Sequence, residues 1–488
     1  MTIIRSFQPV PAGRDARGPI RRFLVCAALA AAALLPAETA RAQGTYSTPP
    51  FQVQNNNPGI SAGRFVLYPA VSLNYSYDDN LFYQSDNIPG AQLVATGRYE
   101  IVPRILIDLP LSRSRVRFQY APVYREYTNA EVQQVSKWSH FFDFEGSMLI
   151  HDVFTVALRD HFVDGTQEVQ EFDPGGEIRF NLVPFTLQEA SLELSLDLGT
   201  RHRVTFIPRT YSLDFDNNVA LGVDPITGEQ ITGPVFYDYS RIGYEGRYTY
   251  KVSPETQMFF SSVSDYGQQE RSQDFYGNVD VDTRTTSVGL QRLMGGIITT
   301  GGSLGWEQMD FKGGGGGDYQ GLAADINLGW NATDVMHFNL GFRRNAYQSY
   351  FLNNNFYTNL EGRLRMTRQV GQSAFWQIGL GLQQNEYGDP VDVRMTSQFA
   401  PTEDANNNGF VDLFESYLPS QGVVRKDRAA FADVGAGWRL RPTMRFTVGY
   451  NYQRRDSNMV QDLGAAGFVE SFDYSASRVY FTLEMGIL

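Results

Sequence analysis

The sequence predicts an all-β fold, a transmembrane antiparallel up-and-down β-barrel of about 18 strands with short periplasmic turns and long extracellular loops. Three observations predict it: an N-terminal secretion signal, an alternation of apolar and polar residues that recurs along the chain, and connections that alternate between short and long. Strict alternation over about 8 to 10 residues is typical of strands with one apolar and one polar face.

The N-terminus carries the features of a cleavable signal peptide. Five arginines precede an apolar run at residues 23–35, and the small-residue pattern Ala40-Arg41-Ala42 follows it. A basic region, a short apolar region and a small-x-small site together predict cleavage near Ala42. The single cysteine, Cys26, lies inside the apolar run, so no disulfide is expected in the mature chain.

We therefore expect three parts: a signal peptide over residues 1–42, a periplasmic N-terminal segment over residues 43–64 and the barrel over residues 65–488. No apolar stretch reaches the roughly 20 residues that a membrane-spanning helix needs. The expected location is the outer membrane of a Gram-negative cell, with outer-membrane lipid as a partner.

The charge balance argues against one class of partner. Removal of residues 1–42 takes away six arginines and two acidic residues, which leaves 35 basic side chains against 51 acidic ones. Because nucleic-acid binders carry basic surfaces, no nucleic acid is expected as a partner. Only four basic residues are lysines, and the guanidinium group of the many arginines suits fixed pairing with carboxylates.

The strand pattern is clearest at residues 191–198, where four leucines alternate with Ser191, Glu193, Ser195 and Asp197. The same period recurs throughout and predicts one apolar and one polar face for each strand. The predicted strands lie near residues 65–78, 101–109, 115–127, 139–150, 153–163, 185–198, 203–215, 237–252, 256–266, 280–294, 297–311, 319–331, 335–348, 355–368, 373–387, 427–441, 444–455 and 473–488.

The links between these strands alternate in length. Short links such as His151-Asp152 and Gly295-Gly296 alternate with long polar ones, which include residues 164–184, 216–236 and 388–426. Short periplasmic turns, longer external loops and an even number of strands are typical of single-chain bacterial barrels.

The polar face is rich in arginine with acids interspersed, and a barrel places this face toward its lumen. The residues predicted to line the lumen are Arg115, Arg117, Arg159, Glu193, Asp197, Arg247, Arg343, Arg363, Arg365 and Arg445. Two interpretations stand: these charges line a wet channel, or they pair across strands and hold the wall. The mixture of signs predicts a polar lumen without a strong charge preference.

Aromatic residues support a lipid-facing surface. Trp306, Trp330, Trp376 and Trp438 all fall on the predicted lipid face, where aromatic side chains form interfacial girdles. The end of the last predicted strand, residues 478–488, resembles the C-terminal strand that the barrel-assembly machinery recognises, which makes this machinery an expected partner during biogenesis. Its final residue departs from the pattern, because leucine stands where an aromatic residue is usual.

Catalysis is not expected. The string Gly301-Gly-Ser303-Leu-Gly305 matches the nucleophile elbow of serine hydrolases, but that chemistry needs a sharp strand-to-helix turn and this string lies within a predicted strand. The five histidines show no spacing typical of metal ligands or of a catalytic triad. No catalytic residue and no organic cofactor are therefore predicted.

The longest predicted loop contains a possible calcium site. The spacing of oxygen ligands fits the twelve-residue calcium loop, with a glycine at the sharp turn. The predicted ligands are Asp404, Asn406, Asn408, the Phe410 carbonyl, Asp412 and Glu415. The alternative is an Asn-Gly turn in a polar loop, since no flanking helices are predicted. If Ca²⁺ binds, its expected role is to stiffen the loop.

The first strands carry a family resemblance. A strand that ends in Tyr77-Asp-Asp-Asn80 is followed by a strand containing Val102-Pro-Arg104 and then by the arginine-flanked stretch at residues 113–120. This arrangement resembles the outer-membrane β-barrel porins encoded within exopolysaccharide gene clusters, most clearly over residues 65–130. The resemblance implies a passive pore or an accessory protein in polysaccharide export, and it assigns no site residue.

Two functions follow as expectations. The first is a pore for passage of a hydrophilic solute, with polysaccharide as the candidate cargo, because a barrel of about 18 strands leaves an aqueous channel unless loops fill it. The alternative is a structural or receptor-like barrel with a plugged lumen and external loops that bind a partner.

Overall fold

The computed structural model describes residues 59–83, 85, 93–130, 132, 137–166, 184–215, 220–223, 230–232, 238–269, 279–313, 317–349, 354–391, 423–458, 461–462, 468–469 and 473–486. Strands dominate this part of the chain, and no helix occurs in it. In particular, these residues include no helix long and apolar enough to cross a membrane.

Eighteen of the strands in the described ranges form one closed antiparallel barrel, which confirms the predicted fold. They are β2 (Phe65–Asp78), β3 (Thr96–Pro110), β4 (Ser114–Tyr127), β5 (Trp138–Ile150), β6 (Phe154–Thr166), β7 (Pro184–Leu198), β8 (His202–Phe215), β11 (Tyr239–Ser253), β12 (Thr256–Gln269), β13 (Val279–Met294), β14 (Ile298–Lys312), β15 (Tyr319–Thr333), β16 (Met336–Gln348), β17 (Phe356–Val370), β18 (Ala374–Val391), β19 (Val423–Arg441), β20 (Met444–Ser457) and β23 (Tyr474–Gly486).

The barrel closes because β2 has a partner on each side. It pairs with β3 along Val66–Asp78 and with the last strand, β23, along Ala70–Asp78. Every other barrel strand pairs with the strands before and after it, so no edge remains unpaired. Closure satisfies the backbone hydrogen bonds that lipid cannot satisfy.

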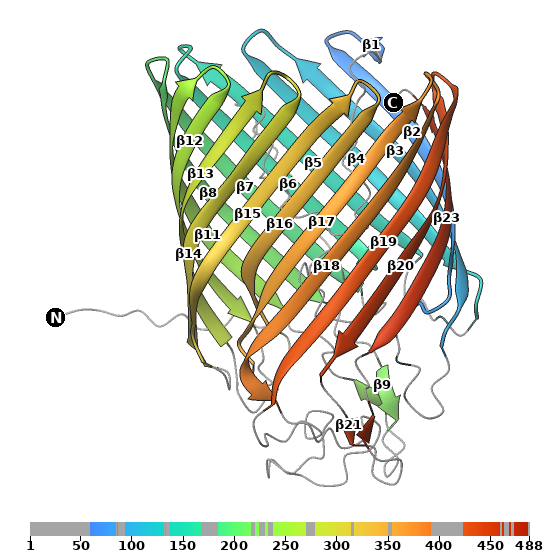
Figure 1. The fold of residues 1–488 in the computed structure, drawn as a ribbon. Helices are drawn as coiled ribbons and strands as arrows, with labels where there is room; N and C mark the ends of the chain where they lie inside the picture. Colours follow the sequence, from blue (N-terminus) through green and yellow to red (C-terminus); the bar gives the residue numbers. More distant parts are fainter. Residues whose placement is uncertain are drawn as a thin grey trace, which may run out of the picture.

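The tight turns gather at one end of the barrel, drawn at the top in Figure 1, and we call it the turn end. The opposite end is the loop end. At the turn between β13 and β14, Gly295 and Gly296 both have positive φ (58° and 70°), the geometry of a two-residue hairpin turn that matches the twist of the strands. His151 and Asp152 adopt the same left-handed region between β5 and β6.

The strand prediction is close to the structure but misses several elements. Sequence reading did not anticipate the short strand β1 (Ile60–Ala62), which pairs with β2, or the two small hairpins β9 (Ala220–Val223) with β10 (Gln230–Thr232) and β21 (Gln461–Asp462) with β22 (Phe468–Val469). Figure 1 shows β9 and β21 at the loop end. Ile60–Ala62 therefore joins the sheet, although it falls within the predicted N-terminal segment at residues 43–64.

Candidate channel lumen

Alternation along each strand separates an apolar outer face from a polar inner face. Large apolar side chains such as Ile242, Val288 and Leu382 are exposed on the outside of the barrel, where only lipid can cover them. Trp306, Trp330 and Trp438 are exposed on the same face, and Trp376 is half-buried there. The described part of the barrel thus has a lipid-facing belt and a polar wall.

A ladder of alternating charge crosses the inner wall from β3 to β7. Arg117 lies between Asp108 (Nε–Oδ1 3.8 Å) and Glu145 (Nη1–Oε2 3.7 Å). Arg159 continues the series between Glu145 (Nε–Oε1 3.8 Å) and Glu193 (Nη2–Oε2 3.9 Å). Asp108 is buried, but the other four side chains are partly exposed, so each pair among these four contributes only about 0–1 kcal/mol to stability. We call these five residues the charge ladder.

Further ion pairs lie on the same wall. Arg115 on β4 makes a bidentate pair with Asp108 on β3 (2.8 and 2.6 Å). Arg203 on β8 makes a bidentate pair with Asp197 on β7 (2.7 and 2.9 Å). Arg247 pairs with its neighbour Glu245 on β11 (Nη2–Oε1 2.7 Å). Paired guanidinium and carboxylate groups with this geometry are both oriented and neutralised.

One pair spans an intervening strand. Arg209 on β8 donates two hydrogen bonds to Asp265 on β12 (2.9 and 2.5 Å), although β11 lies between these strands. Gly243 of β11 is opposite both residues, and a Cβ at this position would collide with Asp265 Oδ1. The glycine is therefore required for a close approach of side chains.

The next sector of the inner wall is uncharged toward the turn end. Ser261 and Ser287 share a hydrogen bond (Oγ–Oγ 2.8 Å), and the inner face of β14 presents Gly301, Ser303 and Gly305. The Gly-Gly-Ser-Leu-Gly string thus lies in the middle of an extended strand and makes no strand-to-helix turn. Small side chains here leave room in the lumen.

The remaining residues predicted to line the lumen lie on the far wall. Arg343 pairs with Asp325 (Nε–Oδ2 3.2 Å), Arg363 contacts Glu361, and Arg445 donates to Glu484 (Nε–Oε2 2.6 Å). Arg365 is exposed. All ten predicted residues therefore lie on the inner face, and the structure adds partners for most of them that sequence reasoning did not name.

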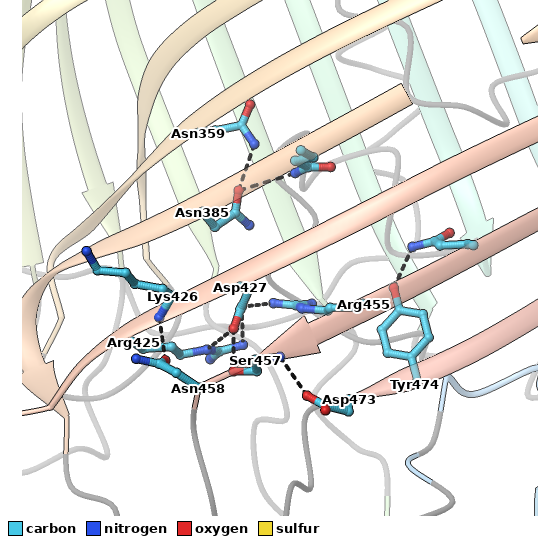
Figure 2. A network of polar contacts seen from close by, with 12 residues as sticks. Asn359, Asn385, Arg425, Lys426, Asp427, Arg455, Ser457, Asn458, Asp473 and Tyr474 are labelled. Atoms are coloured by element: carbon cyan, nitrogen blue, oxygen red, sulfur yellow. Dashed lines mark hydrogen bonds and ion pairs between the residues drawn. The ribbon is translucent and has the colours of Figure 1, made fainter. Parts of the chain in front are cut away.

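A buried polar network at the loop end was also missed. Asp427 accepts hydrogen bonds from Arg425 (3.1 and 2.8 Å), Arg455 and Ser457 Oγ (2.6 Å), as Figure 2 shows. The Arg425 guanidinium also lies 4.6 Å from the centre of the Tyr387 ring, a cation–π contact. The available signal was the Arg425-x-Asp427 spacing, which places both side chains on one face of a strand.

The inner wall is packed differently at its two ends. Toward the loop end, Gln269, Tyr357 and Tyr387 are all at most 2% exposed. Toward the turn end, inner side chains such as Thr299 and Arg365 are exposed. The described wall is therefore wet at the turn end and closely packed at the loop end.

No group of three metal-binding side chains occurs among the described residues. The predicted calcium loop, residues 404–415, lies outside them, as does the predicted signal peptide, residues 1–42. Two histidines of β5 and β6 have polar neighbours: on the inner wall His161 Nδ1 lies 2.8 Å from Asp143 Oδ1, and on the outer face His140 Nδ1 lies 2.9 Å from Tyr120 Oη.

Comparison with known proteins gives one family and several distant structures. No curated protein sequence matches the chain. The outer-membrane protein OpdK from Pseudomonas aeruginosa is 12% identical with a TM-score of 0.43, over 86% of this chain and 98% of its own. OpdQ from the same organism is 9% identical with a TM-score of 0.44, over 86% and 99%. The FrpB iron transporter from Neisseria meningitidis is 8% identical with a TM-score of 0.39, over 86% and 81%. These values carry no information on substrate.

The family match covers most of the barrel. The family described as "Putative beta-barrel porin 2" matches residues 55–400, which include every described strand from β1 to β18. A porin is an outer-membrane barrel, in agreement with the closed antiparallel sheet and its lipid-facing belt. The chain belongs to this beta-barrel porin family and is a porin-like protein of the outer membrane.

Proposed function

We propose that the barrel is a passive channel for hydrophilic solutes. The observation that supports this proposal is the charge ladder, whose side chains are paired and, with the exception of the buried Asp108, partly exposed on the inner wall. Paired charges of both signs offer hydrogen bonds to a polar solute without holding one ion strongly, which suits passage better than capture. Small inner residues on β14, such as Gly301 and Gly305, leave space for that solute.

The channel is tested with purified protein in planar lipid bilayers. Open lumens give discrete, stable conductance steps, and liposomes that contain the protein swell in solutions of small sugars. Persistent silence from samples that run as folded barrels on unheated gels would refute the channel.

More specifically, we propose that the solute is a polysaccharide that moves from the periplasm to the outside of the cell. Polar side chains that follow one another across β3–β7 provide successive partners for the hydroxyl groups of a sugar chain. A strain that lacks the gene should then secrete less polysaccharide and retain more in the periplasm. Unchanged secretion would contradict this cargo while leaving the channel itself intact.

A receptor-like barrel with a closed external end is the second candidate. The observation that favours it is the burial of the inner wall at the loop end, where Arg425, Gln269 and Tyr357 are at most 1% exposed. In this case the external loops bind a partner and the lumen does not conduct. The bilayer measurement separates the two candidates.

We also propose that residues 404–415 bind Ca²⁺, with Asp404 and Glu415 as ligands at the two ends of the loop. Calcium then protects the loop from protease at millimolar concentrations. Asp404→Ala and Glu415→Ala should abolish this protection, and protection that survives both changes would refute the site.

A further inference from the structure

The sheet separates between β15 and β16 near the loop end. The ladder that joins these two strands stops at Arg344, although β16 continues to Gln348. Over this last stretch β16 stays paired with β17, and the final pair of that ladder is Gln348 with Phe356. We call residues 344–348 of β16 and 356–358 of β17 the hairpin end.

The hairpin end lies inside the barrel. By alternation, Ala346 and Phe356 belong to the outer face of their strands. Both instead pack against inner-face side chains of β13, β14 and β15, which are Val281, Met309 and Tyr319. The ring centres of Phe356 on β17 and Phe311 on β14 are 6.4 Å apart. Within the wall, three strand spacings would separate these residues by about 14 Å.

A polar contact extends further across the lumen. Gln348 Nε2 donates to Gln269 Oε1 on β12 (3.2 Å), although β13, β14 and β15 lie between β12 and β16. Four strand spacings along the wall amount to about 19 Å. If the ladder with β15 continued at its register, Gln348 would lie opposite Gln320 instead. The hairpin end therefore projects into the lumen and narrows it at the loop end.

Two side chains replace hydrogen bonds of the interrupted ladder. At the register of that ladder, Ala346 would lie opposite Leu322. Instead, the Ala346 N–H donates to Glu307 Oε2 on β14 (3.0 Å), and the Arg344 guanidinium donates to the Leu322 carbonyl. Because buried backbone groups need hydrogen-bond partners, these contacts stabilise the inward position of the hairpin end.

The narrowing lies at the outer edge of the lipid-facing belt and is uncharged on its lumen side. The outer face of β14 is apolar at Trp306 and polar from Gln308 onward, so the belt ends near the level of Glu307. The side chains that β16 turns toward the lumen here are Asn345 and Tyr347, both partly exposed. A neutral rim of this kind hinders a solute by its size more than by its charge.

We propose that the hairpin end is the constriction that sets the largest solute the channel passes. The proposal rests on the proposed channel and identifies the residues that limit it. Asn345 and Tyr347 meet the solute. Phe356 and Glu307 act as positioning residues, because they hold the hairpin end against the inner wall without facing the open lumen.

The first test locates the hairpin end and does not depend on conduction. Cys26 is the only native cysteine, so cysteine pairs can be introduced into a Cys26→Ser background. Gln348→Cys combined with Gln269→Cys should be joined by a short bifunctional methanethiosulfonate reagent. Gln348→Cys combined with Gln320→Cys should not, although a continued ladder would place these two residues about 5 Å apart. An equal or greater yield for the second pair would overturn the inward position and the constriction with it.

The second test measures the size limit in planar bilayers with neutral polyethylene glycols of increasing length. Phe356→Ala removes the ring that packs on Phe311 and Tyr319. Loss of this buried ring should shift the equilibrium toward a released hairpin end about ten-fold or more. Polymers that the unmodified chain excludes should then enter the lumen and reduce the conductance.

The matched control is Phe342→Ala. Phe342 also lies on β16, but it is exposed on the lipid-facing side and does not belong to the hairpin end. The change removes the same ring, so the size limit should remain that of the unmodified chain. Heat-modifiable gel mobility confirms that both variants are folded barrels before the measurement. An equal increase of the size limit in the control would overturn the constriction.

A reversible rescue completes the test. In Phe356→Ala that also carries Gln348→Cys and Gln269→Cys, the cross-link should restore the original size limit, and a reducing agent should remove it again. Equal size limits in Phe356→Ala and the unmodified chain would refute the constriction and leave the channel intact. If the unmodified chain is silent and Phe356→Ala conducts, the permanently open channel is refuted and the hairpin end is confirmed as the narrowing. Silence from both folded chains would refute the channel together with its constriction.

Discussion

Asp427→Asn tests whether the loop-end network holds the barrel together. The carboxylate accepts hydrogen bonds from Arg425, Arg455 and Ser457, and the two arginines are 0% and 4% exposed. The substitution preserves volume but removes the negative charge that both buried guanidinium groups contact. Removal of one partner from a buried ion pair costs about 3–5 kcal/mol, so the free energy of unfolding should fall by this amount.

Urea titration of the protein in lipid vesicles measures the change, with tryptophan fluorescence and heat-modifiable gel mobility as two independent readouts. The matched control is Asp456→Asn. Asp456 pairs with Arg454 (Nη2–Oδ1 2.8 Å) on the outer face of the same end, but these side chains are 61% and 54% exposed, in the order Arg454 and Asp456. Exposed pairs contribute about 0–1 kcal/mol, so the control should lose little.

A third variant isolates the cause. The combined change Arg425→Met, Asp427→Leu and Arg455→Met replaces the buried charges with apolar groups and should recover stability to within about 1 kcal/mol of the unmodified chain. If Asp427→Asn costs no more than Asp456→Asn, then the network does not support the fold, and the reasoning from its burial is refuted.

Three more predictions test the wall. Gly243→Val should lower the free energy of unfolding by about 2–3 kcal/mol because its side chain collides with a paired carboxylate, whereas Gly246→Val, which has open space around it, should change little; equal losses would contradict the collision. Glu145→Gln should raise the anion-to-cation permeability ratio about two-fold in about 10 mM salt, and an unchanged ratio would place the ladder outside the conduction path. Leu328→Arg on the lipid face should cost about 2–4 kcal/mol in urea titration, and Asn327→Arg on the inner face should cost clearly less; the reverse order would invert the assignment of faces.

The sequence predicts the membrane-embedded part of the barrel best, since lipid outside and water inside impose strict alternation there. β2 has the predicted bounds, residues 65–78, and the four leucines at residues 192–198 of β7 all lie on one face. Beyond the lipid both faces meet polar surroundings, so alternation is lost and strand ends are mispredicted. β19 begins at Val423, where residue 427 was expected, because the intervening residues carry charge on both faces.

Partners across the wall are harder to predict than faces, because they depend on register. Arg209 and Asp265 are 56 residues apart and meet only because three strands align with Gly243 between them. A one-residue slip would move every side chain of a strand to the other face. The alternation in each strand fixes its face, but the pairing of a particular arginine with a particular acid requires the aligned sheet.

The luminal charges had two interpretations, a wet channel or ion pairs that hold the wall together. Each interpretation applies to a different part of the wall. At the loop end, pairs such as Arg425 with Asp427 are buried. Removal of one partner leaves the other charge buried away from water, which lowers the free energy of unfolding. In the charge ladder, Arg159 and Glu145 keep contact with water, so their loss changes the field that a solute meets more than it changes stability. Stability and selectivity should therefore respond to different arginines. A variant scan that measures both quantities on each chain should find large unfolding effects with small selectivity changes at the loop end, and the opposite along the charge ladder.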